Sequence, residues 1–431
     1  MTATARTAGP PSATLRRNRE FRLLWVGQAL SSFGSMLSLV ALPLVLLAKG
    51  EPTTLVALVG TAVAVAGLVA RIPAGLVSDR YPERGLLIGC EVVRLVGFAA
   101  ITVWILVRPL SLWLAVAVVV VAAGAAEVFK PTQLRVVRRV VSAEQLPSAI
   151  SLNQARSYAA AIAGPATAGL LIGLLPVLPF AVDALTFLVS AVCIAAVVPR
   201  RRTAARPRAG AIAPVTAPGP GTAEQGFWLR FTMGWRYLWA DAFLRRSVLY
   251  FSGLTLVSTA LDSALVLGVG REHGGAQLVG WSVSTAAIAG LVGSLATPRL
   301  QRVMPLRAMV ASGPAAGGAL LFLAWLTGST LVFVAGFCVT CLLVPVVNAT
   351  VSSVITLSVP EEVFGRVATA NDFVVQLLQP LGPLVAGVLV SQSLPLAALV
   401  LAVAFVLLAG LAAALPARTT APAAEPAWSA S

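Results

Sequence analysis

Charged side chains are scarce in this sequence, at only 11% of its 431 residues. Soluble domains carry about 25%, so a water-exposed globule of this composition would aggregate. Histidine occurs once, and all four cysteines lie in apolar runs with no further metal ligand near them. The sequence also has no G-x-x-x-x-G-K-[ST] phosphate loop and no Ser–His arrangement. We therefore expect no enzyme, no ATP-driven pump, no metal and no cofactor.

Long apolar runs take the place of the missing charges, since 58% of the residues are hydrophobic. A helix of roughly 20 such residues crosses a bilayer core of ~30 Å. The sequence predicts an all-α polytopic membrane protein with spans near 22–48, 54–78, 85–107, 111–133, 149–175, 177–198, 246–270, 276–297, 306–328, 330–357, 366–390 and 394–415.

One stretch of the chain is repeated. Residues 141–171 align without gaps with residues 359–389, 218 positions later, and the same offset pairs Gly75 with Gly293. A repeat with a constant offset predicts two similarly built halves, each a bundle of six helices. In apolar chains this pattern is typical of transporters that bind substrate between their halves.

Composition predicts the domain limits. Residues 199–226 are rich in Pro, Gly, Ala and Arg, as flexible linkers are, and 226–247 mix aromatic with basic side chains, as interfacial helices do. We expect an N-terminal arm (1–20), a first bundle (21–198), a linker with an interfacial helix (199–245), a second bundle (246–415) and a disordered tail (416–431).

Basic residues predict the orientation of the spans. The formal net charge is +15, and nearly all the basic residues fall on one side of the predicted membrane, whereas the other side has only Lys49, Arg108 and Arg271. By the positive-inside rule, both termini are expected in the cytoplasm. We interpret the basic runs as orientation signals near anionic lipid, not as a nucleic-acid surface. The Lys-poor, Ala- and Arg-rich composition favours a bacterial cytoplasmic membrane.

The loop after the second span carries Gly75, Asp79, Arg80 and Arg84. Physically, a glycine permits close helix packing and an aspartate can hydrogen-bond across a short turn. The stretch resembles the loop 2–3 signature of the major facilitator superfamily, with Pro82 and Glu83 displacing its central glycine. The resemblance implies a fold of two six-helix bundles. It also implies that these four residues form a latch between conformations, with Asp372 expected to pair with Arg80 or Arg84.

The fifth predicted span contains a Gly-Pro element that favours close helix contact and a local bend. It resembles the antiporter signature of superfamily exporters, with one extra residue before the last glycine, and it recurs in the eleventh span. The bend residues are Gly164, Pro165, Gly169, Gly382, Pro383 and Gly387.

Three further stretches and part of the sixth span narrow the resemblance. Residues 15–28, 131–153, 183–191 and 234–245 are together similar to the exporter branch that includes enterobactin exporters and macrolide efflux proteins. The similarity covers about residues 15–415. The sequence departs from that branch at Ser35, where an acid is common, and at Val120, where proton-coupled relatives carry an arginine.

Ionisable residues inside the spans need a partner or a use, because each costs about 2.5–3.5 kcal/mol to insert. Two pairs, Glu91 with Arg94 and Glu127 with Lys130, are spaced to share a helix face. We expect a charge network that closes an inner gate, formed by Arg71, Glu91, Arg94, Glu127, Lys130 and Arg156.

Two aspartates, Asp183 and Asp262, have no basic residue near them in sequence. A buried carboxyl group without a partner can bind and release protons. Asp262 and Glu127 are the leading proton-coupling or substrate-binding residues, with a hydrogen bond between helices as the alternative for Asp262. For Asp183 we favour a structural role.

The few polar residues of the spans suit a cavity for lipophilic solutes; we expect Gln28, Ser35, Asn348, Gln376 and Gln379 to line it. The expected function is export of small amphipathic compounds (drugs, siderophores or secondary metabolites) by proton antiport, by a monomer in the bilayer. An importer or facilitator of the same fold, and a non-transporting lipid scramblase or receptor, remain alternatives.

Overall fold

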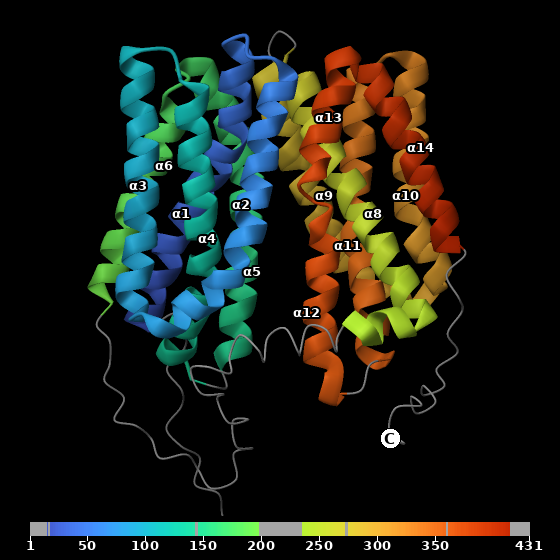
Figure 1. Cartoon of the computed structure of the whole chain (residues 1–431), viewed down its shortest axis with the longest axis horizontal. Coiled ribbons are helices and arrows are strands. Elements are labelled where there is room, and N and C mark those ends of the chain that lie inside the picture. Colours follow the sequence, from blue (N-terminus) through green and yellow to red (C-terminus); the bar gives the residue numbers. More distant parts are fainter. Residues whose placement is uncertain are drawn as a thin grey trace, which may run out of the picture. The chain divides into compact units, whose positions relative to one another are not determined.

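The structure is a computed structural model that describes Leu15 and residues 18–142, 145–197, 235–271, 275–358 and 361–413. These residues are almost entirely helical (Figure 1). They contain 12 helical segments long and apolar enough to cross a membrane, which confirms the predicted all-α, twelve-span fold. The predicted N-terminal arm to residue 14, the linker over 198–234 and the tail after 413 lie outside the described residues. Of the predicted interfacial stretch at 226–247, the structure describes residues 235–247: residues 235–240 are helical, and residues 242–247 form the start of α8.

Contacts divide the chain into two compact units, and the first comprises residues 1–42 and 69–200. It is built from α1 (Arg19–Ala48, in part), α2 (Thr53–Arg80, in part), α3 (Glu83–Val107), α4 (Leu112–Val140), α5 (Leu146–Leu174) and α6 (Leu178–Ala196). Helix α3 packs against both α4 and α6. Their shared core is an apolar cluster of Leu24, Leu87, Cys90, Phe129, Ile194 and Val197.

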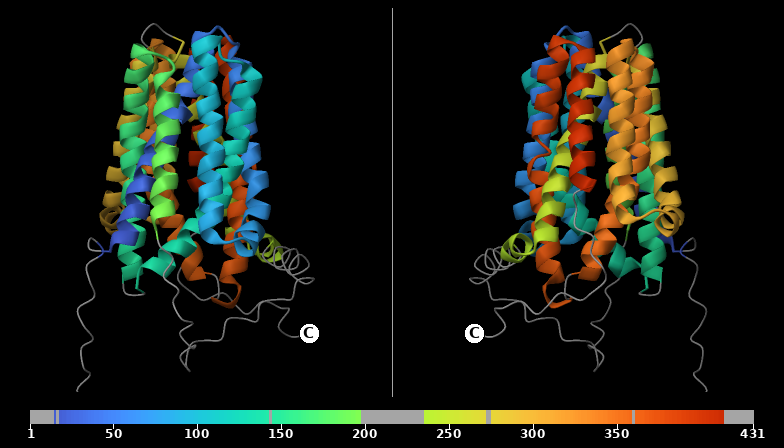
Figure 2. Two further views of the ribbon diagram at one scale, coloured as in Figure 1. Left: turned by 90° about the vertical axis from the view of Figure 1, so that its left-hand side faces the viewer. Right: turned by 90° about the vertical axis from the view of Figure 1, so that its right-hand side faces the viewer.

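The second unit comprises residues 43–68 and 201–431. Its helices are α8 (Ala242–Ala264), η3 (Leu265–Val269), α9 (Gly275–Val303), α10 (Leu306–Thr327), α11 (Thr330–Ser358), α12 (Glu361–Leu377), α13 (Leu381–Gln392) and α14 (Leu394–Ala413). Helix α10 packs against α11 and α14 (Figure 2). Residues 43–68, which we expected in the first bundle, group by contacts with this unit; the bundle limits themselves stay a prediction.

Two predicted spans of the second unit are not regular α-helices. The span expected at 366–390 is interrupted at residues 378–380, so α12 and α13 follow one another as separate pieces (Figure 1). Pro380 has no N–H to give to the helix, and the Gln379 and Leu381 N–H groups turn back to the carbonyls three residues earlier, each at 3.1 Å. The span expected at 246–270 ends in the π-helix η3.

Helix ends follow local side-chain chemistry. The Asp241 carboxylate accepts the N–H groups of Phe243 (2.8 Å) and Leu244 (3.0 Å), which caps the start of α8. Helix α10 is followed by Gly328, whose φ of +62° is a left-handed conformation that favours glycine.

Candidate functional site

Glu91 on α3 is a fully buried acid of the first unit, and its side chain has no accessible surface. Its carboxylate accepts hydrogen bonds from Gln28 Nε2 (3.2 Å) on α1 and from Ser190 Oγ (2.9 Å) on α6. Ser31 Oγ lies 3.3 Å away, and Arg94 Nη1 forms an ion pair at 3.5 Å. Burying a carboxylate is costly unless it is paired and hydrogen-bonded. These donors therefore offset the cost of burying Glu91.

Arg94, the partner of Glu91, is also held by aromatic rings. Its guanidinium lies 4.7 Å from the ring centre of Phe187 and 5.8 Å from that of Phe129. Cation–π contacts of this kind stabilise a guanidinium in a site with little water. Gln28, which we expected to line a cavity, is only 5% exposed and donates a hydrogen bond to Glu91 in this cluster.

Asp183 on α6 is fully buried. Its Oδ1 atom lies 3.4 Å from the Thr186 hydroxyl, while Oδ2 has no hydrogen-bond partner. The carboxyl group lies so close to Gly34 of α1 that any side chain there would overlap it. Among the described residues, Asp183 forms no ion pair, and Arg94 pairs with Glu91.

A second charge cluster surrounds Glu127 on α4. Its two carboxylate oxygens lie 3.1 Å from Arg71 Nε of α2 and 2.6 Å from Lys130 Nζ. The predicted network is therefore divided into two separate clusters, one at Glu91 and one at Glu127. Arg156 belongs to neither, and its inclusion in the network is corrected: it forms no ion pair or hydrogen bond among the described residues.

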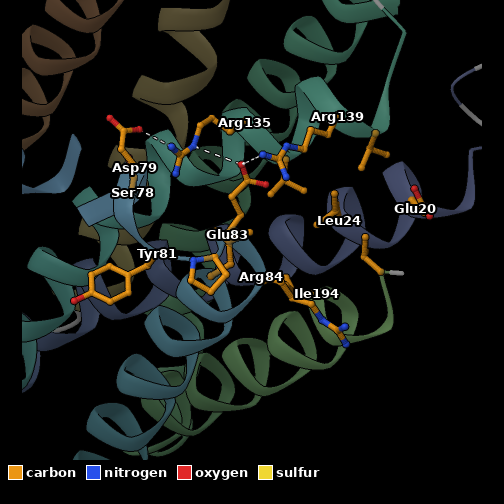
Figure 3. A pocket seen from close by; sticks show the side chains of 15 residues that line it. Glu20, Leu24, Ser78, Asp79, Tyr81, Glu83, Arg84, Arg135, Arg139 and Ile194 are labelled. Carbon is orange, nitrogen blue, oxygen red and sulfur yellow. Dashed lines mark hydrogen bonds and ion pairs between the residues drawn. The ribbon is translucent and has the colours of Figure 1, made fainter. Parts of the chain in front are cut away.

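Two of the predicted latch residues, Asp79 at the end of α2 and Arg84 at the start of α3, line a cavity of about 380 Å³ beside the end of α4 (Figure 3). Asp79 pairs with Arg135 of α4 at 2.5 Å, and Glu83 pairs with Arg139 at 3.0 Å and with Arg135 at 3.7 Å. Arg84 donates to the carbonyl of Ala195 at the end of α6. The acids of this loop are thus bridged to α4, and among the described residues no ion pair links Asp79 to Arg80 or Arg84.

Sequence reasoning treated Arg135 and Arg139 as orientation signals and missed their part in this cluster. Their spacing of four residues, which puts both on one face of α4, was the available signal. The close packing expected at Gly75 is wrong for this structure, because a side chain there would meet nothing within 4 Å.

The remaining predicted residues are distributed over the second unit and α1. Asp262 on α8 and Asp372 on α12 are exposed, and Asp262 makes no hydrogen bond or ion pair among the described residues, so its expected burial is corrected. Asn348 is exposed, and Gln376 and Gln379 are partly buried. The Ser35 hydroxyl donates to the Ser31 carbonyl at 2.9 Å.

The two Gly-Pro elements make matching contacts inside their own units. A side chain at Gly164 of α5 would overlap Met36 of α1, and one at Gly382 of α13 would overlap Thr259 of α8. Pro165 lies inside α5, next to the buried face that also holds Gly169. Pro383 contacts Gly60, and Gly387 lies against Ala57, both in the part of α2 that belongs to the second unit. In each half, the fifth span therefore packs on the first.

Within the described ranges, no group of three His, Cys, Asp or Glu side chains lies close enough together to hold a metal ion.

Comparison with protein-family models matches residues 24–383 to the Major Facilitator Superfamily. This chain belongs to the Major Facilitator Superfamily. It is therefore a transporter of the superfamily's fold and a multi-pass membrane protein, as the loop 2–3 motif implied.

Solved structures of superfamily transporters are similar in fold to this chain. The nucleoside transporter NupG has a TM-score of 0.70 at 12% identity, covering 92% of this chain and 98% of its own. A bacterial homologue of the human lysosomal transporter Spinster has a TM-score of 0.71 at 13% identity, covering 94% and 97%. A bacterial homologue of the iron transporter ferroportin has a TM-score of 0.63 at 16% identity, covering 94% and 100%. No curated protein matches significantly.

Proposed function

We propose that this chain is a secondary active transporter that exports small amphipathic organic compounds by alternating access, in exchange for protons. Membership of the Major Facilitator Superfamily supports the transport function. The spans themselves are apolar, with 58% hydrophobic residues in the chain, which suits lipophilic solutes more than sugars or ions. Two resemblances favour outward movement: the Gly-Pro elements resemble the antiporter signature of superfamily exporters, and residues 15–28, 131–153, 183–191 and 234–245 resemble the exporter branch.

Proton coupling is supported by acids that lack a full set of partners. Asp183 is buried, and its Oδ2 atom has no hydrogen-bond partner among the described residues. A buried carboxyl group without a full set of partners can bind and release a proton. Asp262 is accessible and unpaired among the described residues. Glu127 is already paired with Arg71 and Lys130, so we assign coupling to Asp183 and Asp262 rather than to Glu127.

The cluster of Asp79, Glu83, Arg135 and Arg139 is the proposed latch. Ion pairs between the α2–α3 loop and α4 stabilise one conformation of the first unit. Under the predicted orientation this cluster lies on the cytoplasmic side, where superfamily members carry their latch. Gly75, Arg80, Arg84 and Asp372 remain proposed members.

Accumulation of chemically varied compounds in a pump-deficient bacterial host tests export. Cells that express the protein should accumulate less of at least one amphipathic compound than cells with an empty vector, and an uncoupler should restore accumulation. An importer or facilitator, the competing function that similarity to NupG allows, would instead raise uptake, or speed it equally in both directions. A scramblase or receptor would leave accumulation unchanged.

A further inference from the structure

Arg156 occupies an unusual position for a cation in a membrane protein. It lies on the buried face of α5 with Ala160 and Gly164, and only 9% of it is exposed. Ten residues of helix, or about 15 Å, separate it from the start of α5. Contacts with α1 flank it: the Leu152 carbonyl accepts Trp25 Nε1 at 3.2 Å, and Gly164 packs on Met36. Arg156 is thus well inside the span.

The guanidinium of Arg156 has no partner to offset its burial. Its Nε and Nη1 atoms are buried and make no hydrogen bond, and no carboxylate among the described residues pairs with it. An arginine cannot shed its proton in a protein, so the cation cannot neutralise itself. A buried charge without a partner is strongly unfavourable. Among the described residues, nothing therefore satisfies these two nitrogen atoms.

Other cations deep in the spans of the first unit differ from Arg156 in this respect. Arg94 pairs with Glu91, while Arg71 and Lys130 pair with Glu127. Both acids are already engaged, and Asp183 forms no ion pair with Arg156 among the described residues. A negative group from outside the chain would supply the partner that Arg156 lacks there.

We propose that Arg156 binds the negatively charged group of the transported compound, so that the substrates are amphipathic organic anions. Guanidinium groups hold carboxylates, sulfonates and phosphates through charge-assisted hydrogen bonds. This inference rests on the proposed transport function and names the class of its substrate.

Three matched probes test the inference: naphthalene-2-sulfonate, neutral 2-naphthol and the trimethyl-2-naphthylammonium cation. Binding to the purified full chain in lipid nanodiscs is measured by calorimetry and by the shift in Tm. We expect the sulfonate to bind at least about tenfold more tightly than the other two. Arg156→Gln should lose about ten- to a hundredfold in sulfonate affinity and leave naphthol binding unchanged, and Arg156→Lys should keep part of the preference. The matched control is Arg71→Gln, which removes a cation that is already paired and should leave the preference for the sulfonate unchanged.

Stability of the unliganded variants separates binding from a structural role. Because Arg156 is unsatisfied without a ligand, Arg156→Gln should keep or raise Tm, whereas loss of a structural ion pair would lower it. Equal binding of all three probes, or unchanged sulfonate affinity in Arg156→Gln, would overturn the proposal. If uncoupler-sensitive export is seen only for neutral or cationic compounds, the inference fails while export stands. If nothing is exported, the binding data still decide the role of Arg156.

Discussion

At the scale of single residues, the first unit handles each membrane charge in a different way. Glu91 is surrounded by donors from three helices, Glu127 neutralises two cations, and Asp183 keeps an unpartnered oxygen. Each of these carboxyl groups loses hydration free energy when it is buried, so the groups differ in how far their neighbours offset that loss. Groups with full partners stabilise the fold, and the incompletely satisfied groups are the ones we assign to transport.

Removing the Glu91 carboxylate should destabilise the protein strongly. In Glu91→Leu, the buried Arg94 and the Gln28 and Ser190 donors lose their acceptor. We expect a loss of about 3 kcal/mol or more in the free energy of unfolding, measured by denaturant titration in mixed micelles. The control is Glu51→Leu, which breaks the partly exposed pair with Lys49 and should cost about 1 kcal/mol or less. Equal losses in the two variants would mean that the Glu91 cluster is not structural.

Sequence separation explains which of these contacts could be predicted. The pairs Glu91–Arg94 and Glu127–Lys130 are three residues apart, and helical geometry alone puts each on one face. Contacts that depend on packing between helices were out of reach, such as Ser190 with Glu91 and Arg135 with Asp79. The isolation of Arg156 was missed for the same reason, since it depends on which acids other helices bring near.

At the scale of helices, small residues decide how closely elements pack. Gly164 and Gly382 occur at equivalent places of the internal repeat, and each lets the fifth span of its half meet the first. The Gly-Pro pattern was visible in the sequence, but its partners were not. The interruption of the span at Pro380 was not predicted either, because hydropathy measures how long an apolar run is and not whether its helix is continuous.

Alanine at two glycines of the first unit should have opposite effects. Gly164→Ala places a methyl group against the Met36 side-chain base and should lower Tm, because the two helices must separate. Gly89→Ala on α3 meets nothing within 4 Å and should keep or raise stability by about 0.5–1 kcal/mol through helix propensity. Tm of each purified variant in the same detergent is the measurement. A gain in Gly164→Ala would show that α1 and α5 are not in close contact.

At the scale of the whole molecule, composition and the repeat were sufficient to predict twelve spans in two halves, and the structure and the family match agree with them. The transported compound could not be read from the sequence, since apolar spans accept many lipophilic solutes. The proposed direction of transport rests on the resemblance to exporters, whereas the proposed proton coupling rests on Asp183 and Asp262.

Proton-driven movement of a solute by the protein alone is the central claim. Sealed inverted vesicles containing only this chain, with an acidic lumen, should accumulate a compound identified by the host assay, and an uncoupler should abolish the accumulation. Asp183→Asn or Asp262→Asn should make uptake independent of the pH gradient. The comparison variant, Glu127→Gln, should keep the dependence on the gradient. Accumulation no greater than in protein-free vesicles, or uptake by the unmodified protein that persists when the gradient is collapsed, would contradict the account.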